Sequence, residues 1–193
     1  DEVSMVKFAW SIDMRLISRT DKYIEIKNMN NFIEKYEIIA EFPFTSESKR
    51  MGIIVKNVEH GHYIFYMKGA ESVIENFCTE DKKSYIKENS ELLASSGLRT
   101  LVFTQKMLSE SFVKKWILEY NSAKNDTTDS SNKKVNEVIS KLECEMEYLC
   151  VTGVEDLLQD NVAETIETLQ MANIKFWMLT GDKIETAKCI AIS

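Results

Sequence analysis

Residues 41–51 have the sequence EFPFTSESKRM, and this stretch separates two predicted strands. Apolar residues on either side predict strands over Ile38–Phe42 and Met51–Val55. Pro43, the single proline of the chain, follows the first of them. Proline donates no N–H to a sheet ladder, so it favours a strand end or an edge. We therefore expect the chain to leave the sheet after Pro43.

Two interpretations are open for the side chains of this segment. Phe44 and Lys49 could face solvent, where a flat ring beside an ammonium group suits a planar anionic ligand such as a nucleotide. Composition alone favours the other interpretation, in which Phe44 belongs to the core and Lys49-Arg50 is a solvated edge.

The overall composition excludes several classes of protein. The chain has 193 residues, of which 44% are hydrophobic and 28% charged, as is typical of a globular domain. A net charge of -7 argues against a nucleic-acid-binding surface. The four cysteines lack C-x-x-C spacing, and the pair His60 and His62 lacks a third ligand, so no metal site is predicted. Because the chain begins without methionine and ends inside a helical pattern, we expect a piece of a longer protein.

Short β-rich segments, polar turns and amphipathic helices fill the first three quarters of the chain. This pattern predicts an α+β domain over residues 1–146, with a mostly antiparallel sheet flanked by helices. The predicted strands are Arg15–Ser18, Tyr23–Ile26, Tyr36–Phe42, Met51–Val55, Tyr63–Met67 and Leu98–Phe103. The predicted helices are Glu2–Trp10, Ala70–Phe77, Glu80–Ala94, Ser109–Tyr120 and Val135–Glu143. The polar stretch 121–134 is predicted to be a mobile loop.

The remaining residues, 147–193, follow a different pattern. An apolar stretch near 148–156 is followed by a helix over Val162–Ala172, a strand over Ile174–Leu179 and a helix from Lys183. Strands that alternate with helices of this length predict a parallel sheet, and hence a second, incomplete domain. We expect its strand Ile174–Leu179 to be poorly buried.

Two basic residues at strand ends are candidates for anion binding. Lys68 ends the predicted strand before Gly69, and the strand would fix where its ammonium group points, although a lysine in water is the commoner outcome. Arg99 begins an apolar strand and needs a partner, for which a ligand phosphate and an internal carboxylate are equal candidates.

A third candidate is the run Thr180-Gly181-Asp182, at the C-terminal end of the predicted parallel strand. Open α/β sheets bind ligands at this end. A hydroxyl, a glycine and a carboxylate there could hold a phosphoryl group and help place Mg²⁺, or could form a simple turn. No Walker A and no G-x-G-x-x-G pattern occurs, which disfavours P-loop and Rossmann proteins.

Five ordered motifs resemble those of P-type ATPases over nearly the whole chain. They are Phe44…Lys49-Arg50-Met51, Lys68-Gly69-Ala70-Glu71, Leu98-Arg99-Thr100, Thr152-Gly153-Val154-Glu155-Asp156 and Leu179-Thr180-Gly181-Asp182-Lys183. Within the family, Asp1-Glu2-Val3 and the run EDLLQD at 155–160 are similar to boxes of the type IV branch, the phospholipid flippases. The phrases FPFTSESKRMG and YMKGAE resemble the flippase subgroup that works without an accessory subunit.

The resemblance assigns roles to nine residues. In the nucleotide site, Phe44 corresponds to the ring that stacks on adenine and Glu2 to an acid near the adenine amino group. Lys49 corresponds to a lysine at the pocket lip, Lys68 to a lysine deep in the site and Arg99 to an arginine that reaches the phosphates. Among the catalytic residues, Thr180, Gly181 and Asp182 correspond to the T-G-D run that contacts the transferred phosphoryl group. Asp156 corresponds to the aspartate of a D-P-P-R type segment, which reads Asp-Leu-Leu-Gln in this chain.

The resemblance implies an ATP- and Mg²⁺-dependent phospholipid translocase, with residues 147–193 as part of a haloacid-dehalogenase-like phosphorylation domain. It implies a membrane-embedded parent, in an endomembrane or the plasma membrane, that exposes this domain to the cytoplasm. The phosphorylated segment D-K-T-G-T and the magnesium segment G-D-G-x-N-D do not occur in these residues, so we expect nucleotide binding without turnover. One alternative is an interaction module that keeps the fold without binding nucleotide. A dehalogenase-like phosphatase is disfavoured because no D-x-D nucleophile segment occurs.

Overall fold

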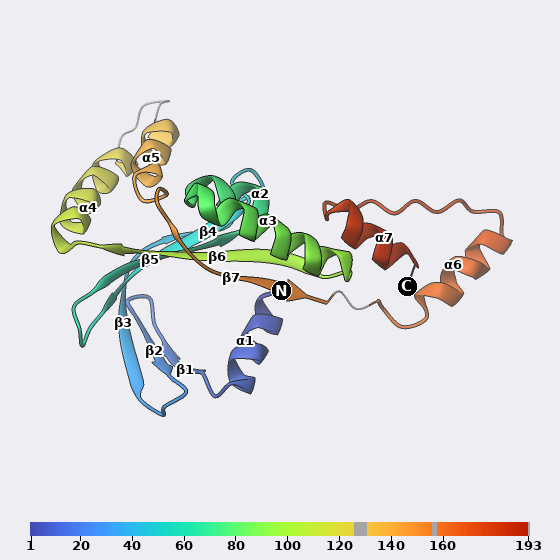
Figure 1. Cartoon of the computed structure of the whole chain (residues 1–193), viewed down its shortest axis with the longest axis horizontal. Helices are drawn as coiled ribbons and strands as arrows, with labels where there is room; N and C mark the ends of the chain where they lie inside the picture. Colours follow the sequence, from blue (N-terminus) through green and yellow to red (C-terminus); the bar gives the residue numbers. More distant parts are fainter. Residues whose placement is uncertain (126–130, 156–157, 193) are drawn as a thin grey trace.

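The computed structural model describes residues 1–125, 131–155 and 158–192. Its centre is a seven-stranded sheet whose strands lie in chain order, from β1 to β7, with every neighbouring pair antiparallel. Figure 1 shows this sheet with helices on both sides. The arrangement confirms the predicted α+β class, with a mostly antiparallel sheet flanked by helices.

Every strand predicted before residue 104 is present, and several are longer than expected. The strands are β1 Arg15–Arg19, β2 Tyr23–Lys27, β3 Ile33–Phe42, β4 Arg50–Asn57, β5 Tyr63–Gly69, β6 Arg99–Leu108 and β7 Glu147–Val154. The start of β3 was not predicted because its residues are polar. It is a strand because it pairs with β2, with Glu34 opposite Ile26 and Lys35 opposite Glu25. Strand β3 ends at Phe42, directly before Pro43, as the position of the proline predicts.

The helices of the described residues are α1 Glu2–Ser11, α2 Glu71–Ile74, the short 3₁₀ turn η1 Glu75–Phe77, α3 Glu80–Ser95, α4 Glu110–Lys124, α5 Ser131–Ser140, α6 Val162–Met171 and α7 Ile184–Ile192. None of these helices is both long and apolar enough to cross a membrane. The predicted loop 121–134 is partly wrong, because α4 continues to Lys124 and buries Ala123. Residues 126–130 of that loop lie outside the described residues.

One face of the sheet packs against helices α2 to α5 and forms the core. Along β5 the buried residues alternate strictly, with Tyr63, Phe65 and Met67 on the core face. Helix α4 contributes Trp116, whose ring stacks on Tyr120 and forms a T-shaped pair with Phe42. Because the alternation has a period of two, Lys68 must project from the opposite face of the sheet.

That opposite face lies on the side of α1. Figure 1 shows α1 on one side of the sheet and α2 to α5 on the other. Helix α1 buries none of its residues, and its apolar side chains Val3, Phe8 and Trp10 are exposed. The face that carries Lys68 is therefore covered far less than the core face.

Strand β7 was assigned to the wrong kind of sheet. We predicted that the apolar stretch near 148–156 begins a β-α-β unit of a parallel sheet. Instead, β7 pairs antiparallel with β6, with Val151 opposite Val102 and Tyr148 opposite Thr104. Pairing with β6 lets Tyr148 and Val151 pack against the core. The antiparallel sheet thus includes residues that we had placed in the second domain.

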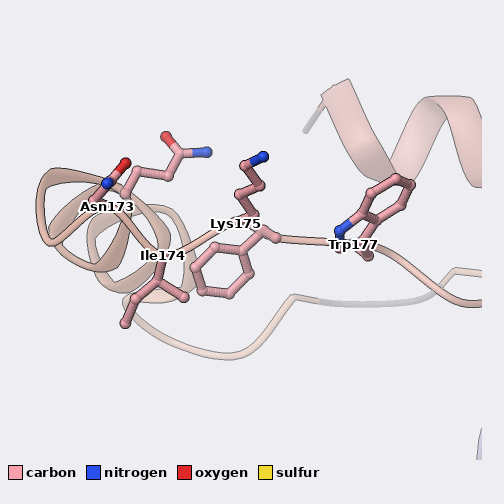
Figure 2. A pocket seen from close by; sticks show the side chains of 6 residues that line it. Asn173, Ile174, Lys175 and Trp177 are labelled. Atoms are coloured by element: carbon pink, nitrogen blue, oxygen red, sulfur yellow. The ribbon is translucent and has the colours of Figure 1, made fainter.

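The predicted strand Ile174–Leu179 is absent from the described residues. This segment has no ladder partner there, and an isolated strand leaves its backbone groups unpaired. Its apolar side chains, among them Trp177 and Leu179, are exposed. Figure 2 shows the extended segment after α6, where Asn173, Ile174, Lys175 and Trp177 line a cavity of about 310 Å³. The lining residues of this cavity include none of the predicted site residues.

Candidate functional site

Lys68 lies at the end of β5, on the less covered face of the sheet. In the ladder it lies between Met51 of β4 and Phe103 of β6. Its ammonium nitrogen is 5.6 Å from the centroid of the Phe103 ring, and 16% of its side chain is exposed. The strand and the flanking apolar side chains therefore hold a cation in a defined position, which is the less common of the two outcomes that the sequence left open.

Gly69, next to Lys68, lies where two segments of backbone approach each other closely. A Cβ atom at this position would lie 2.6 Å from the carbonyl oxygen of Lys49, which is too close for any side chain. The amide of Ala70 donates a hydrogen bond to the same carbonyl, at 3.1 Å. Glycine thus permits close backbone contact between the strand that carries Lys68 and the loop that carries Phe44 and Lys49.

The loop after Pro43 projects Phe44 into solvent. The Phe44 side chain is 59% exposed, which excludes the interpretation that it is a core residue. Its neighbour Phe42, in contrast, packs against three aromatic rings of the core. Hydrogen bonds within the loop, from the Ser48 amide to Thr45 Oγ1 at 3.0 Å and from the Lys49 amide to the Thr45 carbonyl at 2.9 Å, give it a defined shape.

Lys49 and Arg50 have opposite environments. Lys49 is exposed and adopts a positive φ of 49°, at the point where the loop returns to the sheet. Arg50 turns toward the core face, where Nε and Nη2 each donate to the Glu143 carboxylate at 2.7 Å. The Arg50 guanidinium also lies 5.0 Å from the centroid of Phe77. Of this basic pair, only Lys49 is therefore available on the exposed side of the loop.

Arg99, at the start of β6, has carboxylate partners. Its Nε and Nη2 donate to Asp182 Oδ1 and Oδ2 at 3.1 and 3.4 Å, and its Nη1 donates to Asp1 Oδ1 at 3.3 Å. The sequence allowed either a ligand phosphate or an internal carboxylate as the partner of Arg99. In the structure, its partners are internal carboxylates.

The run Thr180-Gly181-Asp182 forms a turn before α7. Thr180 Oγ1 donates to Asp182 Oδ2 at 3.0 Å and accepts from the Asp182 amide at 3.1 Å. A Cβ atom on Gly181 would meet no atom within 4 Å, so the turn is open around this residue. The turn presents a hydroxyl and a carboxylate next to Arg99.

Helix α7 holds this turn against the start of β6. Thr186 Oγ1 donates to the Leu98 carbonyl at 3.2 Å, and Lys183 forms an ion pair with Glu71 of α2. Gly97 has a positive φ of 79°, and a Cβ atom there would lie 3.0 Å from Cys189 of α7. These contacts bring together residues more than 80 positions apart in sequence.

Glu2, in the first turn of α1, contacts Lys68. The Lys68 ammonium donates to Glu2 Oε1 at 2.6 Å and to Oε2 at 2.7 Å. The sequence did not predict this pair, since Glu2 was assigned by resemblance to the adenine amino group. It also did not identify Asp1 and Glu71, which pair with Arg99 and Lys183.

Six of the nine predicted site residues therefore lie in two sets of contacts that meet at the start of α1, where Asp1 contacts Arg99 and its chain neighbour Glu2 contacts Lys68. They are Glu2 and Lys68 in the first set and Arg99, Thr180, Gly181 and Asp182 in the second. Phe44 and Lys49 lie on the adjoining loop, joined to β5 through the Ala70 amide. Asp156 lies outside the described residues. Phe103 was missed by the sequence reasoning, although the strand alternation of β6 was its available signal.

The chain is similar to known proteins over its whole length. The family described as "P-type ATPase, cytoplasmic domain N" matches residues 1–161. The chain is 45% identical over 193 residues to a "Probable phospholipid-transporting ATPase IIB" of Danio rerio. It is 41% identical over 197 residues to "Probable phospholipid-transporting ATPase tat-5" of Caenorhabditis elegans. It is 44% identical over 195 residues to "Phospholipid-transporting ATPase neo1" of Schizosaccharomyces pombe.

Each of these alignments covers all of this chain but only a small part of the relative. The chain spans 17% of the first relative and 18% of the other two. The family match, in contrast, covers most of the chain, including the whole antiparallel sheet and the residues Glu2, Phe44, Lys68 and Arg99. The chain therefore belongs to the P-type ATPases, and its residues 1–161 correspond to the cytoplasmic domain N of that family.

Proposed function

We propose that this chain binds ATP on the Lys68 face of its sheet and serves as the nucleotide-binding part of a phospholipid-translocating ATPase of the type IV branch. The observation that carries the proposal is the gathering of Lys68, Arg99 and the Thr180–Asp182 turn at one end of the sheet, beside the loop of Phe44. Cations held in fixed positions next to an exposed aromatic ring suit a nucleotide.

Each group has a distinct task in the proposed complex. The exposed Phe44 ring offers a stacking surface for adenine. Lys68 lies between Met51 and Phe103, so its ammonium group has few alternative positions and can neutralise a phosphate. Arg99 has a planar fork that matches phosphate oxygens, which would take the place of its partners Asp182 and Asp1. Lys49 adds positive charge at the rim.

Mg²⁺ is part of the proposal as a partner of the nucleotide phosphates. The oxygens of Thr180 and Asp182 are ligands of the type that Mg²⁺ prefers, so this turn fits part of its coordination shell. Within the described residues, no group of three His, Cys, Asp or Glu side chains could hold a metal by itself. When bound, Mg²⁺ would neutralise charge on the phosphates.

The role in lipid transport rests on the relatives, whose names describe phospholipid-transporting ATPases. We propose that the parent protein moves a phospholipid between membrane leaflets, with this domain on the cytoplasmic side, in an endomembrane or the plasma membrane. The domain would deliver ATP to an aspartate that lies outside these residues. Residues 147–193 would then include part of the phosphorylation domain, and the parent would work without an accessory subunit.

The proposal is tested by a titration of the ¹⁵N-labelled chain with ATP, followed by NMR. Amide signals near Phe44, Lys68 and Arg99 should shift together, with a dissociation constant on the order of 0.1–1 mM, since only one stacking contact and a few partly exposed charges contribute. The signals of Trp177 and its neighbours, at the cavity of Figure 2, serve as the internal control and should not move. Absence of shifts at the Lys68 face would instead support an interaction module that has lost nucleotide binding.

A further inference from the structure

Phe103 is the neighbour of Lys68 on β6, directly opposite it in the ladder. Side chains directly opposite each other in an antiparallel pair have Cβ atoms about 4.5–5.5 Å apart, so the ring and the lysine stem lie side by side. The ammonium nitrogen is 5.6 Å from the ring centroid. This distance is within the roughly 6 Å range of a cation–π interaction. The sheet itself therefore places an aromatic ring at the cation.

The Phe103 ring is held from a second strand as well. On the side of β7, Phe103 lies opposite Cys150. Directly after it the register of this ladder shifts, so that Thr104 lies opposite Tyr148. An irregularity of this kind increases the local twist and changes the direction of a side chain. Phe103 is thus fixed between two strands, at the point where the ladder is irregular.

An aromatic ring holds a cation without neutralising it. The Lys68 side chain is only 16% exposed, so its ammonium group has lost much of its water and needs partners. The face of the Phe103 ring attracts the ammonium group through its quadrupole but carries no net charge. Unlike a carboxylate, the ring therefore adds no repulsion toward an anionic phosphate.

We propose that Phe103 is a positioning residue of the nucleotide site, whose ring keeps the Lys68 ammonium group where a phosphate can bind it. This inference rests on the proposed ATP site and adds to it a residue outside the five sequence motifs. A free lysine side chain loses conformational freedom when it binds a phosphate, which lowers affinity roughly two- to tenfold. A ring that already holds the ammonium group reduces this loss.

The test compares the chain with Phe103→Leu, which keeps an apolar side chain but removes the aromatic face. Phe103→Tyr keeps the face, and replacement of Phe103 by a fluorinated phenylalanine keeps the shape of the ring while weakening its attraction for a cation. The matched control is Tyr23→Leu, because Lys35 lies 4.9 Å from the centroid of the Tyr23 ring on β2 and β3, away from Lys68.

Two measurements separate a positioning role from a structural one. Each protein is titrated with ATP and with adenosine, and dissociation constants are taken from the amide shifts near Phe44. The titration is repeated with Phe103→Leu in a Lys68→Met background. The second measurement is the NMR signal of the Lys68 ε-CH₂ protons without nucleotide, which the current of an adjacent ring face displaces to high field.

We expect Phe103→Leu and the fluorinated ring to bind ATP roughly two- to fivefold more weakly, while adenosine binds as in the wild type. Phe103→Tyr and Tyr23→Leu should match the wild type for both ligands. In the Lys68→Met background, Phe103→Leu should not change ATP affinity. The displacement of the Lys68 signal should disappear in Phe103→Leu and persist in Phe103→Tyr.

Other outcomes would overturn the inference. If Phe103→Leu and the fluorinated ring bind ATP as the wild type does, the ring does not position Lys68, and the ATP site itself stands. If ATP and adenosine weaken alike, the ring contacts the base. If Phe103→Leu weakens ATP equally in the Lys68→Met background, Phe103 acts through packing. If ATP causes no shifts near Phe44 and Lys68 in the wild type, the proposed ATP site is wrong and the inference falls with it.

Discussion

Arg99 and Asp182 are 83 positions apart in sequence and are joined by two hydrogen bonds, from Nε to Oδ1 at 3.1 Å and from Nη2 to Oδ2 at 3.4 Å. The first residue begins β6 of the antiparallel sheet, and the second precedes α7. A guanidinium for which we propose phosphate binding is thus paired with the carboxylate of the run Thr180–Asp182, for which we propose a phosphoryl contact. The pair links the proposed nucleotide site to the C-terminal helices.

This link should hold α7 in place. Asp182→Asn keeps the shape of the side chain but removes the charge that pairs with Arg99, so the contact should weaken by roughly 0.5–1 kcal/mol, given its partial exposure. Amide hydrogen exchange should therefore speed up about two- to fivefold in residues 184–192. Glu167→Gln, which removes a charge from α6, is the control and should leave this exchange unchanged. Equal exchange in Asp182→Asn and the wild type would show that Thr186 and Lys183 suffice to hold α7.

Phe44→Ala should separate binding from stability. Because stacking on an aromatic ring contributes about 1–3 kcal/mol per base, ATP affinity should fall roughly tenfold or more. The unfolding free energy should stay within about 0.5 kcal/mol of the wild type, since Phe44 is exposed. Phe32→Ala is a matched control, because Phe32 is also an exposed phenylalanine, at 69%, in the turn between β2 and β3. Unchanged ATP affinity in Phe44→Ala would place the adenine elsewhere.

The Arg50–Glu143 pair should matter for stability rather than for binding. The Glu143 side chain is only 7% exposed, so Arg50→Met leaves a carboxylate buried without its partner. Breaking a buried pair in this way costs about 3–5 kcal/mol. The loss should appear in urea unfolding, and the double variant Arg50→Met with Glu143→Leu should recover much of it. If the double variant is as unstable as Arg50→Met, the loss comes from the packing of Arg50 on Phe77 instead.

Tyr36 should make the fold sensitive to alkaline pH. Burial, and then the hydrogen bond that its hydroxyl donates to Glu34 at 2.5 Å, raise the pKa of Tyr36 from 10.0 to about 12. The folded state therefore keeps the phenol proton more tightly than the unfolded state. The resulting stability is fully present below pH 10 and is lost as the pH rises from 10 through about 12.

The measurement is the unfolding free energy of the wild type and of Tyr36→Phe between pH 9 and 12. The wild type should lose more stability than the variant over this range. Burial also raises the pKa values of Tyr66 and Tyr148, but both proteins share these groups, so the difference isolates Tyr36. Parallel curves would contradict the assignment.

The 193-residue chain should bind nucleotide without hydrolysing it. The residues contain no D-K-T-G-T segment, so the nucleophile of phosphoryl transfer is missing. Phosphate release should equal the buffer background with ATP, Mg²⁺ and lipid, and no acid-stable phosphoenzyme should form. ADP should bind about as well as ATP, because most of the proposed contacts lie with the adenine and the inner phosphates. A phosphoenzyme on this chain would overturn the assigned roles.

Local patterns in the sequence determined much of the antiparallel sheet. The apolar runs and the polar turns between them predicted β1 to β5, because antiparallel neighbours joined by short turns depend on contacts between residues close in sequence. Pro43 marked the end of β3 for a covalent reason, since its nitrogen carries no hydrogen. Lys68 could be predicted as a candidate for anion binding because it is a charged residue at the end of an apolar strand.

The partners that are distant in sequence were decided only by the tertiary structure. An apolar segment does not specify which strand it joins, so β7 was predicted parallel and is antiparallel to β6, and 174–179 was predicted as a strand although no described strand pairs with it. The contacts of Arg99 with Asp182 and of Lys68 with Glu2 span 83 and 66 positions. Sequence patterns record periodicity along one element, whereas an ion pair depends on where separate elements meet after the core has packed.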